Sequence, residues 1–252
     1  MDINCLFDPN EKPLDRIITD GGYCGILRSI ACIGDSLSSG EFESRDANGN
    51  AGFHDYYEYS WGQFLARMAG LKAYNFSRGG MTAERYVQTF ADEMGYWDSS
   101  LATQAYIIAL GCNDLINGSI DDVCIEDYTK NAPTFAGYYA QIIQRYKEIQ
   151  PDAKFFLVTF PKCDGGDRDI LHRQILYDIA EKFDNCYVID LKEYSNEFDA
   201  EFRKKFFLGG HMTAAGYLFM AQLIGSYIDY IIRHNMEDFS QIGFVGTPHK
   251  YI

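Results

Sequence analysis

Short apolar runs alternate with longer stretches of helical periodicity along most of the chain. A buried strand is typically a continuous apolar run of about four to eight residues, rich in β-branched side chains. Runs of this kind predict strands over 30–33, 72–76, 105–110, 154–160 and 186–191. Apolar residues spaced three and four apart predict helices over 61–70, 135–149, 169–182 and 213–234.

Strands and helices therefore alternate about five times, which predicts a parallel sheet with helices on both faces. The expected fold class is α/β, a three-layer α/β/α arrangement with a sheet of about five strands. No linker-like run divides the chain, so we predict one domain over 1–252. Within it we expect an N-terminal arm over 1–28 with a short edge strand around 23–27, and a long loop over 41–59. A C-terminal tail over 235–252 is expected to pack on the domain or on a second copy of the chain.

The composition excludes several classes of partner. The formal charge is −14, from 36 acidic and 22 basic residues, and it opposes binding to nucleic acid. No apolar run approaches the ~18 residues that a membrane span needs, so no membrane is expected as a partner. The seven cysteines show no metal-binding spacing, and the first residues lack the pattern of a signal peptide. A cytoplasmic location is therefore predicted.

Polar and glycine residues lie in loops that follow the predicted strands. Four of these loops contain groups that can do chemistry: Gly34-Asp35-Ser36, Gly79-Gly80, Asn113-Asp114 and His211. The first is also compatible with an ordinary turn, because Gly, Asp and Ser all favour turns. The carboxyl ends of parallel strands gather at one edge of an open sheet, so residues far apart in the sequence converge there.

Together the four loops offer the parts that acyl transfer requires. The Ser36 hydroxyl becomes a nucleophile once a base takes its proton, and His211 supplies an imidazole for that purpose. A glycine N–H and the side-chain amide of Asn113 can hold the oxyanion of a tetrahedral intermediate. This chemistry needs no metal or organic cofactor, and none is expected.

The same four segments resemble those of a known enzyme family. G-D-S at 34–36, N-F-S-R-G-G at 75–80, G-C-N-D at 111–114 and H-M-T-A-A-G-Y at 211–217 are similar in order and spacing to the blocks of the SGNH (GDSL) hydrolases. The resemblance implies a flavodoxin-like sheet with strand order 2-1-3-4-5 and an esterase or acylhydrolase activity. It implies these roles: Ser36 as nucleophile, His211 as general base, and an oxyanion hole formed by the N–H groups of Ser36 and Gly80 and the side chain of Asn113. Asp35 and Asp114 would tie the loops together.

One position departs from the family pattern. The family usually has an Asp three residues before the catalytic His, and here that position is Leu208. In the serine-protease triad, neutralising the corresponding Asp lowers kcat by about 10⁴-fold. We therefore expect a Ser–His dyad whose imidazole N–H is held by a backbone carbonyl or by a carboxylate from elsewhere. Asp190, at the end of a predicted strand, is one candidate.

Aromatic residues cluster between 53 and 61, just beyond the predicted nucleophile. Such rings stack on sugars, and the alternative is that they pack the loop onto the domain. We predict that His54, Tyr57 and Trp61 contact the substrate. The expected substrate is a short-chain acyl ester, acetyl first, of a carbohydrate or small molecule.

Other functions stay open at this point. One is a lysophospholipase- or thioesterase-type acylhydrolase, and another is a catalytically weak homologue that binds carbohydrate. An α/β-hydrolase is disfavoured, because Ser38 replaces the second Gly of G-x-S-x-G and Ser36 comes too early in the chain.

Overall fold

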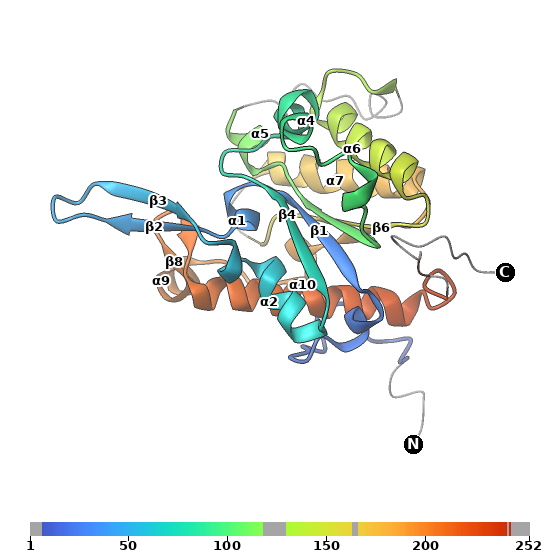
Figure 1. Ribbon diagram of the computed structural model, residues 1–252. Helices are drawn as coiled ribbons and strands as arrows, with labels where there is room; N and C mark the ends of the chain where they lie inside the picture. Colours follow the sequence, from blue (N-terminus) through green and yellow to red (C-terminus); the bar gives the residue numbers. More distant parts are fainter. Residues whose placement is uncertain (1–6, 118–129, 163–165, 241, 243–252) are drawn as a thin grey trace.

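The computed structural model describes residues 7–117, 130–162, 166–240 and 242. In these residues the centre is a parallel five-stranded sheet (Figure 1). Its strands, in spatial order, are β4 (Lys72–Ser77), β1 (Ser29–Gly34), β5 (Ala105–Ala109), β6 (Lys154–Val158) and β7 (Cys186–Ile189). Counted along the chain within this sheet, the order is 2-1-3-4-5, which confirms the predicted flavodoxin-like arrangement.

Strand β1 lies in the middle of the sheet, and its side chains divide between the two faces. Ala31 and Ile33 belong to the apolar core on one face, and Ile30 and Cys32 to the core on the other. Both faces of β1 are buried, which explains why the strand is a continuous apolar run. At the end of β1, Gly34 pairs with both β4 and β5. The loops that follow these three strands therefore leave the same edge of the sheet.

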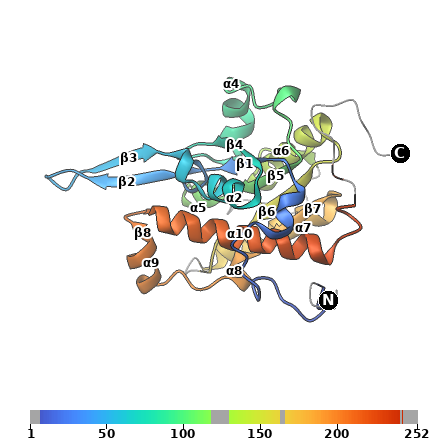
Figure 2. The ribbon, with the colours of Figure 1, turned by 60° about the horizontal axis from the view of Figure 1, so that its bottom comes forward.

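Helices cover both faces of the sheet, which confirms the three-layer prediction (Figures 1 and 2). One layer contains α2 (Trp61–Ala69) and α10 (Ala214–His234). The other contains α6 (Phe135–Ile149), α7 (Asp167–Lys182) and a segment made of α3 (Ala83–Arg85), a π-helical turn (Tyr86–Phe90) and α4 (Ala91–Glu93). Hydroxyl side chains cap the long helices: Thr134 accepts from the N–H of Gly137, and Thr213 from that of Gly216.

The prediction of a long loop over 41–59 is wrong. These residues form an antiparallel hairpin, β2 (Glu41–Arg45) and β3 (Ala51–Asp55), followed by a 3₁₀ turn (Tyr57–Tyr59). The Asp46 side chain accepts two backbone N–H groups and closes the turn of the hairpin. Figures 1 and 2 both show the hairpin projecting from the body of the protein.

The expected edge strand around 23–27 is also wrong, because the segment is a 3₁₀ helix (Gly22–Ile26). It packs on α10, where the N–H of Tyr23 donates to Asp229 Oδ1 at 2.8 Å. The N-terminal arm is therefore fixed by polar side chains of a buried helix and not by the edge of the sheet.

Short elements complete the carboxyl edge of the sheet and the segment before α10. They are α1 (Ser36–Ser39), α5 (Cys112–Ile116), α8 (Leu191–Tyr194), α9 (Ala200–Phe206), β8 (Phe207–Leu208) and β9 (His211–Met212). A further 3₁₀ turn (Ser99–Leu101) precedes β5. In the part of the chain that the structure describes, no helix is long and apolar enough to cross a membrane. Most of the tail predicted to pack on the domain or on a second copy lies outside the described residues.

Candidate active site

Ser36 is the first residue of α1, and only Asp35 separates it from the end of the central strand β1. Asp35 caps this short helix, because its Oδ1 accepts the N–H of Leu37 at 3.0 Å. Burial raises the pKa of Asp35 to about 6, against the opposing effects of the Leu37 N–H and of His211. The cap fixes the turn on which the half-buried Ser36 side chain stands.

Gly79 and Gly80 follow β4, the strand next to β1. Gly80 has a φ of +70°, a left-handed conformation that favours glycine. No heavy atom lies within 4 Å of the position that a Cβ would occupy there, so this turn faces open space. The hydrogen bonds of the described residues use neither the Gly80 N–H nor the Ser36 N–H. Both donors are available to a ligand.

Asn113 lies in α5, after β5 on the other side of β1. Its Nδ2 donates to the Met81 carbonyl at 3.1 Å and to Asp35 Oδ2 at a longer 3.4 Å. The adjacent Asp114 accepts the N–H of Ala83 at 3.1 Å. These bonds join the three loops, which agrees with the tying role expected for Asp35 and Asp114.

His211 lies in β9, between two glutamates of the hairpin strand β2. Its Nε2 is 2.9 Å from Glu41 Oε1, and its Nδ1 is 3.5 Å from Glu43 Oε2. The ring of Phe53, on β3, meets the imidazole edge to face at 5.5 Å between ring centres. The contacts of His211 therefore come from a segment that the sequence had indicated as a loop.

The hairpin is fixed to the body at its base. Ser39 Oγ donates to Asp55 Oδ1 at 2.7 Å, and the Tyr217 hydroxyl donates to the Glu41 carbonyl at 2.6 Å. Phe42 packs against the Tyr217 ring at 5.4 Å between centres. Helices α1 and α10 thus place the glutamates of β2 beside His211.

Asp190 is not the partner of His211. Its Oδ2 accepts from Arg173 Nε at 2.7 Å and from the Tyr177 hydroxyl at 2.8 Å. Its Oδ1 caps α8 by accepting the N–H of Glu193 at 3.1 Å. The buried carboxylate is occupied by these contacts, so the hypothesis that it orients the imidazole is wrong.

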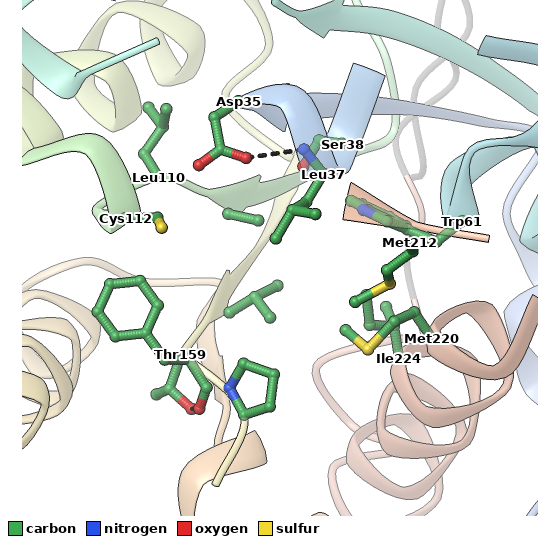
Figure 3. A pocket seen from close by; sticks show the side chains of 14 residues that line it. Asp35, Leu37, Ser38, Trp61, Leu110, Cys112, Thr159, Met212, Met220 and Ile224 are labelled. Atoms are coloured by element: carbon green, nitrogen blue, oxygen red, sulfur yellow. Dashed lines mark hydrogen bonds between the residues drawn. The ribbon is translucent and has the colours of Figure 1, made fainter. Parts of the chain in front are cut away.

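An apolar cavity of about 70 Å³ lies at the junction of these loops (Figure 3). Its walls include the sequence neighbours of three predicted site residues: Asp35 and Leu37 flank Ser36, Cys112 precedes Asn113, and Met212 follows His211. Most of the other lining side chains are apolar, among them Trp61 of α2, Val158 of β6, and Met220 and Ile224 of α10. Almost all of the lining is therefore apolar.

A second, open hollow of about 320 Å³ lies between the hairpin and the loop after β4. It is lined by Glu41, Phe53, Asp55, Arg78 and Gly79. Phe53 is 57% exposed. Charged groups of both signs and one accessible ring therefore surround this space.

The three predicted substrate contacts lie in different surroundings. His54 is exposed on β3, with its Nε2 2.9 Å from Ser44 Oγ, and lines a hollow on the side of the hairpin. The Tyr57 hydroxyl is buried beside Cys32, and this burial raises its pKa. Trp61 is only 2% exposed and forms part of the cavity wall. His54 is thus open to solvent, while Trp61 can meet a ligand only inside the cavity.

Sequence reasoning missed Glu41, Glu43 and Asp55, and it noticed Phe53 only as one member of the aromatic cluster. Only E-F-E at 41–43 alternates with a period of two, and Ser44 and Arg45 do not continue it, so no local pattern predicts the hairpin. Among the described residues, no cluster of His, Cys, Asp and Glu side chains is arranged to hold a metal ion.

Comparisons with known proteins bear on this arrangement. The sequence profile of the GDSL-like lipase/acylhydrolase family matches residues 32–218, a range that contains all four segments. No curated protein matches the chain.

Several solved structures share the fold. A family two carbohydrate esterase from Clostridium thermocellum, in complex with cellohexaose, is 19% identical, with a TM-score of 0.59 over 90% of this chain and 66% of that one. A family two carbohydrate esterase from Cellvibrio japonicus is 16% identical, with a TM-score of 0.61 over 81% and 61%. A putative lipolytic protein of the G-D-S-L family from Desulfitobacterium hafniense is 17% identical, with a TM-score of 0.51 over 79% and 98%. This chain spans about two thirds of the length of the two carbohydrate esterases.

Proposed function

The chain belongs to the GDSL-like lipase/acylhydrolase family, and we propose that it is a serine esterase that removes short acyl groups, acetyl first, from a carbohydrate or another small hydroxyl compound. Membership in the family makes it a hydrolase that acts on esters. The acyl length, the alcohol and the residue roles are the parts that we propose.

The observation that carries the proposal is the small apolar cavity. It is bounded by the residues next to Ser36, Asn113 and His211, so an acyl group bonded to Ser36 would have an apolar wall beside it. An engineered cavity of about 150 Å³ holds benzene, and this cavity of about 70 Å³ has roughly half that volume. Acyl groups of about two to four carbons fit this size.

In the proposed reaction, the Ser36 hydroxyl attacks the ester carbonyl while His211 takes the hydroxyl proton. The N–H groups of Ser36 and Gly80 and the Asn113 amide hold the oxyanion, for which the long 3.4 Å contact to Asp35 gives way. The ester C–O bond then breaks, and the proton passes from His211 to the departing alcohol. Water attacks the acyl-enzyme by the same route and releases the carboxylic acid.

The alcohol part of the ester would lie in the open hollow beside the hairpin. Glu41, Asp55 and Arg78 offer charged acceptors and donors for hydroxyl groups, and the exposed Phe53 ring offers a stacking surface. Hydroxyl-rich sugars combine polar edges with apolar faces, which suits this lining. The apolar cavity would thus hold the small acyl group, and the open hollow would hold the larger polar alcohol.

Two alternative functions would require different structural features. A lysophospholipase- or thioesterase-type acylhydrolase would need space for a long acyl chain, which a cavity of about 70 Å³ does not provide. A protein that binds carbohydrate without cleaving esters is favoured by one observation, the 2.9 Å contact between His211 Nε2 and Glu41. That contact occupies the nitrogen that would take the Ser36 proton.

The test is hydrolysis of p-nitrophenyl acetate by the full chain, with Ser36→Ala and His211→Ala as matched variants. We expect a Ser36-dependent rate that falls as the acyl chain lengthens from acetate to octanoate. The substrate classes are then compared by measuring hydrolysis of acetylated oligosaccharides, a lysophospholipid and an acyl thioester. Equal background rates for the wild type and Ser36→Ala on every ester would refute the esterase, and retained binding of the oligosaccharides would favour the non-catalytic alternative.

A further inference from the structure

His211 lacks the carboxylate that its family usually places three residues before it, because Leu208 stands there. Leu208 is half exposed and carries no polar side-chain atom. The Nδ1 atom of His211 is nevertheless buried, without a hydrogen-bond partner in the described part of the chain. A buried ring nitrogen without a partner is unfavourable by about 1–3 kcal/mol. The side chains around Nδ1 therefore indicate which group orients the imidazole.

The Glu43 carboxylate faces this nitrogen, with Oε2 at 3.5 Å from Nδ1. The Glu43 side chain is only 6% exposed and is held by two other groups. The N–H of Gly210 donates to Oε2 at 2.8 Å, and the guanidinium of Arg45 pairs with Oε1. The carboxylate is thus fixed beside the loop that carries His211.

We propose that Glu43 is the positioning residue of His211, and that it takes the place of the aspartate that Leu208 replaces. The inference rests on the proposed function, in which His211 is the general base. By accepting a hydrogen bond from Nδ1–H, Glu43 keeps Nε2 unprotonated and able to take the Ser36 proton. The present 3.5 Å separation shortens on substrate binding, since catalytic hydrogen bonds are often long in ligand-free enzymes.

Glu41, on the other side of the imidazole, is not equivalent to Glu43. It contacts Nε2, the nitrogen that must face Ser36, so it competes with the nucleophile and does not support it. Burial raises the pKa of Glu41, whereas the Gly210 N–H lowers the pKa of Glu43. The Gly210 N–H thus favours the charged form of Glu43, and Glu43 lies on the side where a negative charge supports the base.

The experiment compares Glu43→Gln with Glu43→Asp in the full chain. Glu58→Gln is the matched control, because Glu58 is an exposed carboxylate that follows the same hairpin. We expect Glu43→Gln to lower kcat on p-nitrophenyl acetate at least about 100-fold with KM within about twofold, as for loss of a triad carboxylate. Glu43→Asp keeps the charge and is expected to recover at least about tenfold of that loss. All rates are measured well below the unfolding temperature of each variant.

Nitrogen-15 NMR of the His211 ring supplies a readout that a merely structural role would not move. Because Glu41 contacts Nε2 in the ligand-free protein, the spectra are recorded with Glu41→Ala in every sample. We expect the Nδ1–H tautomer with Glu43 present and in Glu58→Gln, and a shift toward Nε2–H in Glu43→Gln. Equal kcat values for Glu43→Gln and Glu58→Gln, or an unchanged tautomer, would overturn the role of Glu43. If the wild type is no faster than Ser36→Ala, the proposed function fails instead, and the tautomer in the same samples still tests the contact.

Discussion

The carboxylate of Glu43 lies directly against the backbone of Gly209, and a Cβ added at residue 209 would overlap both of its oxygens. Gly209 also has a φ of +65°, in the left-handed region. Gly210 differs from it, because a Cβ there would lie 3.9 Å from Glu43 Oε2, an ordinary contact. The two adjacent glycines therefore have different requirements, although the sequence alone shows only a glycine pair.

Gly209→Ala is expected to move Glu43 away from His211 and to strain the backbone by about 1–2 kcal/mol. We predict a lower kcat for ester hydrolysis together with a lower free energy of unfolding, measured by urea titration. Gly210→Ala is the control and should keep kcat within about twofold of the wild type, because its N–H still donates to Glu43. Similar losses of kcat in Gly209→Ala and Gly210→Ala would show that any side chain added to this loop lowers the activity, whether or not it displaces Glu43.

Asp114→Asn should change how stability depends on pH. Burial raises the pKa of Asp114 to about 7, above the value of about 3.9 in an unfolded chain. The folded state therefore binds this proton more tightly, so the contribution of Asp114 to stability is fully present below about pH 4 and is lost as the pH rises through about 7. Asn cannot ionise and still accepts the Ala83 N–H through its carbonyl oxygen.

The free energy of unfolding of Asp114→Asn relative to the wild type should therefore rise between pH 4 and pH 8. One pKa unit corresponds to about 1.4 kcal/mol, which sets an upper limit of about 4 kcal/mol on the rise. Urea titrations at several pH values measure it. A difference between the two proteins that does not change with pH would mean that Asp114 is not the group that titrates.

The central sheet could be predicted from the sequence because its inner strands, β1, β5 and β6, are buried along most of their length and form largely apolar runs. The hairpin could not be predicted in this way. Most of β3 is exposed, and β2 buries mainly the charged Glu43, so neither strand shows an apolar face. Its position depends on contacts with α1 and α10, which local periodicity does not report.

The positions of Ser36, Gly80 and Asn113 at neighbouring strand ends follow from the topology, which the sequence indicated correctly. Their chemical roles stay predictions. The surroundings of His211 could not be predicted from the sequence. Glu43 precedes His211 by more than 160 residues, and nothing in either segment specifies that the two side chains meet. Residue type could not separate Tyr57 and Trp61 from the exposed Phe53 either, since all three are large aromatic side chains.

Arg233 should be essential for the attachment of the N-terminal arm to α10. Its guanidinium is buried, pairs with Asp229 at 2.8 Å and also pairs with Glu11 of the arm. Removing one partner of a buried ion pair typically destabilises a protein by about 3–5 kcal/mol. We predict a loss of this size for Arg233→Met, measured by urea titration, with KM for the ester unchanged.

Arg145→Met is the comparison for that prediction. Arg145 forms an exposed pair with Asp92 at 3.8 Å and lies over the Trp97 ring, and such surface contacts contribute about 1 kcal/mol or less. Equal losses for Arg233→Met and Arg145→Met would mean that the arm is not held by the buried pair.

Met220→Ala tests whether the apolar cavity receives the acyl group. Met220 lines the cavity from α10, and its truncation lengthens the available space. Each buried methylene is worth about 0.8 kcal/mol, so two additional methylenes should raise kcat/KM for hexanoate relative to butyrate about tenfold over the wild-type ratio. Leu218→Ala is the control, because Leu218 lies on the same helix but is exposed. An unchanged ratio in a folded Met220→Ala protein would place the acyl group outside the cavity, and the size limit on the substrate would then need another cause.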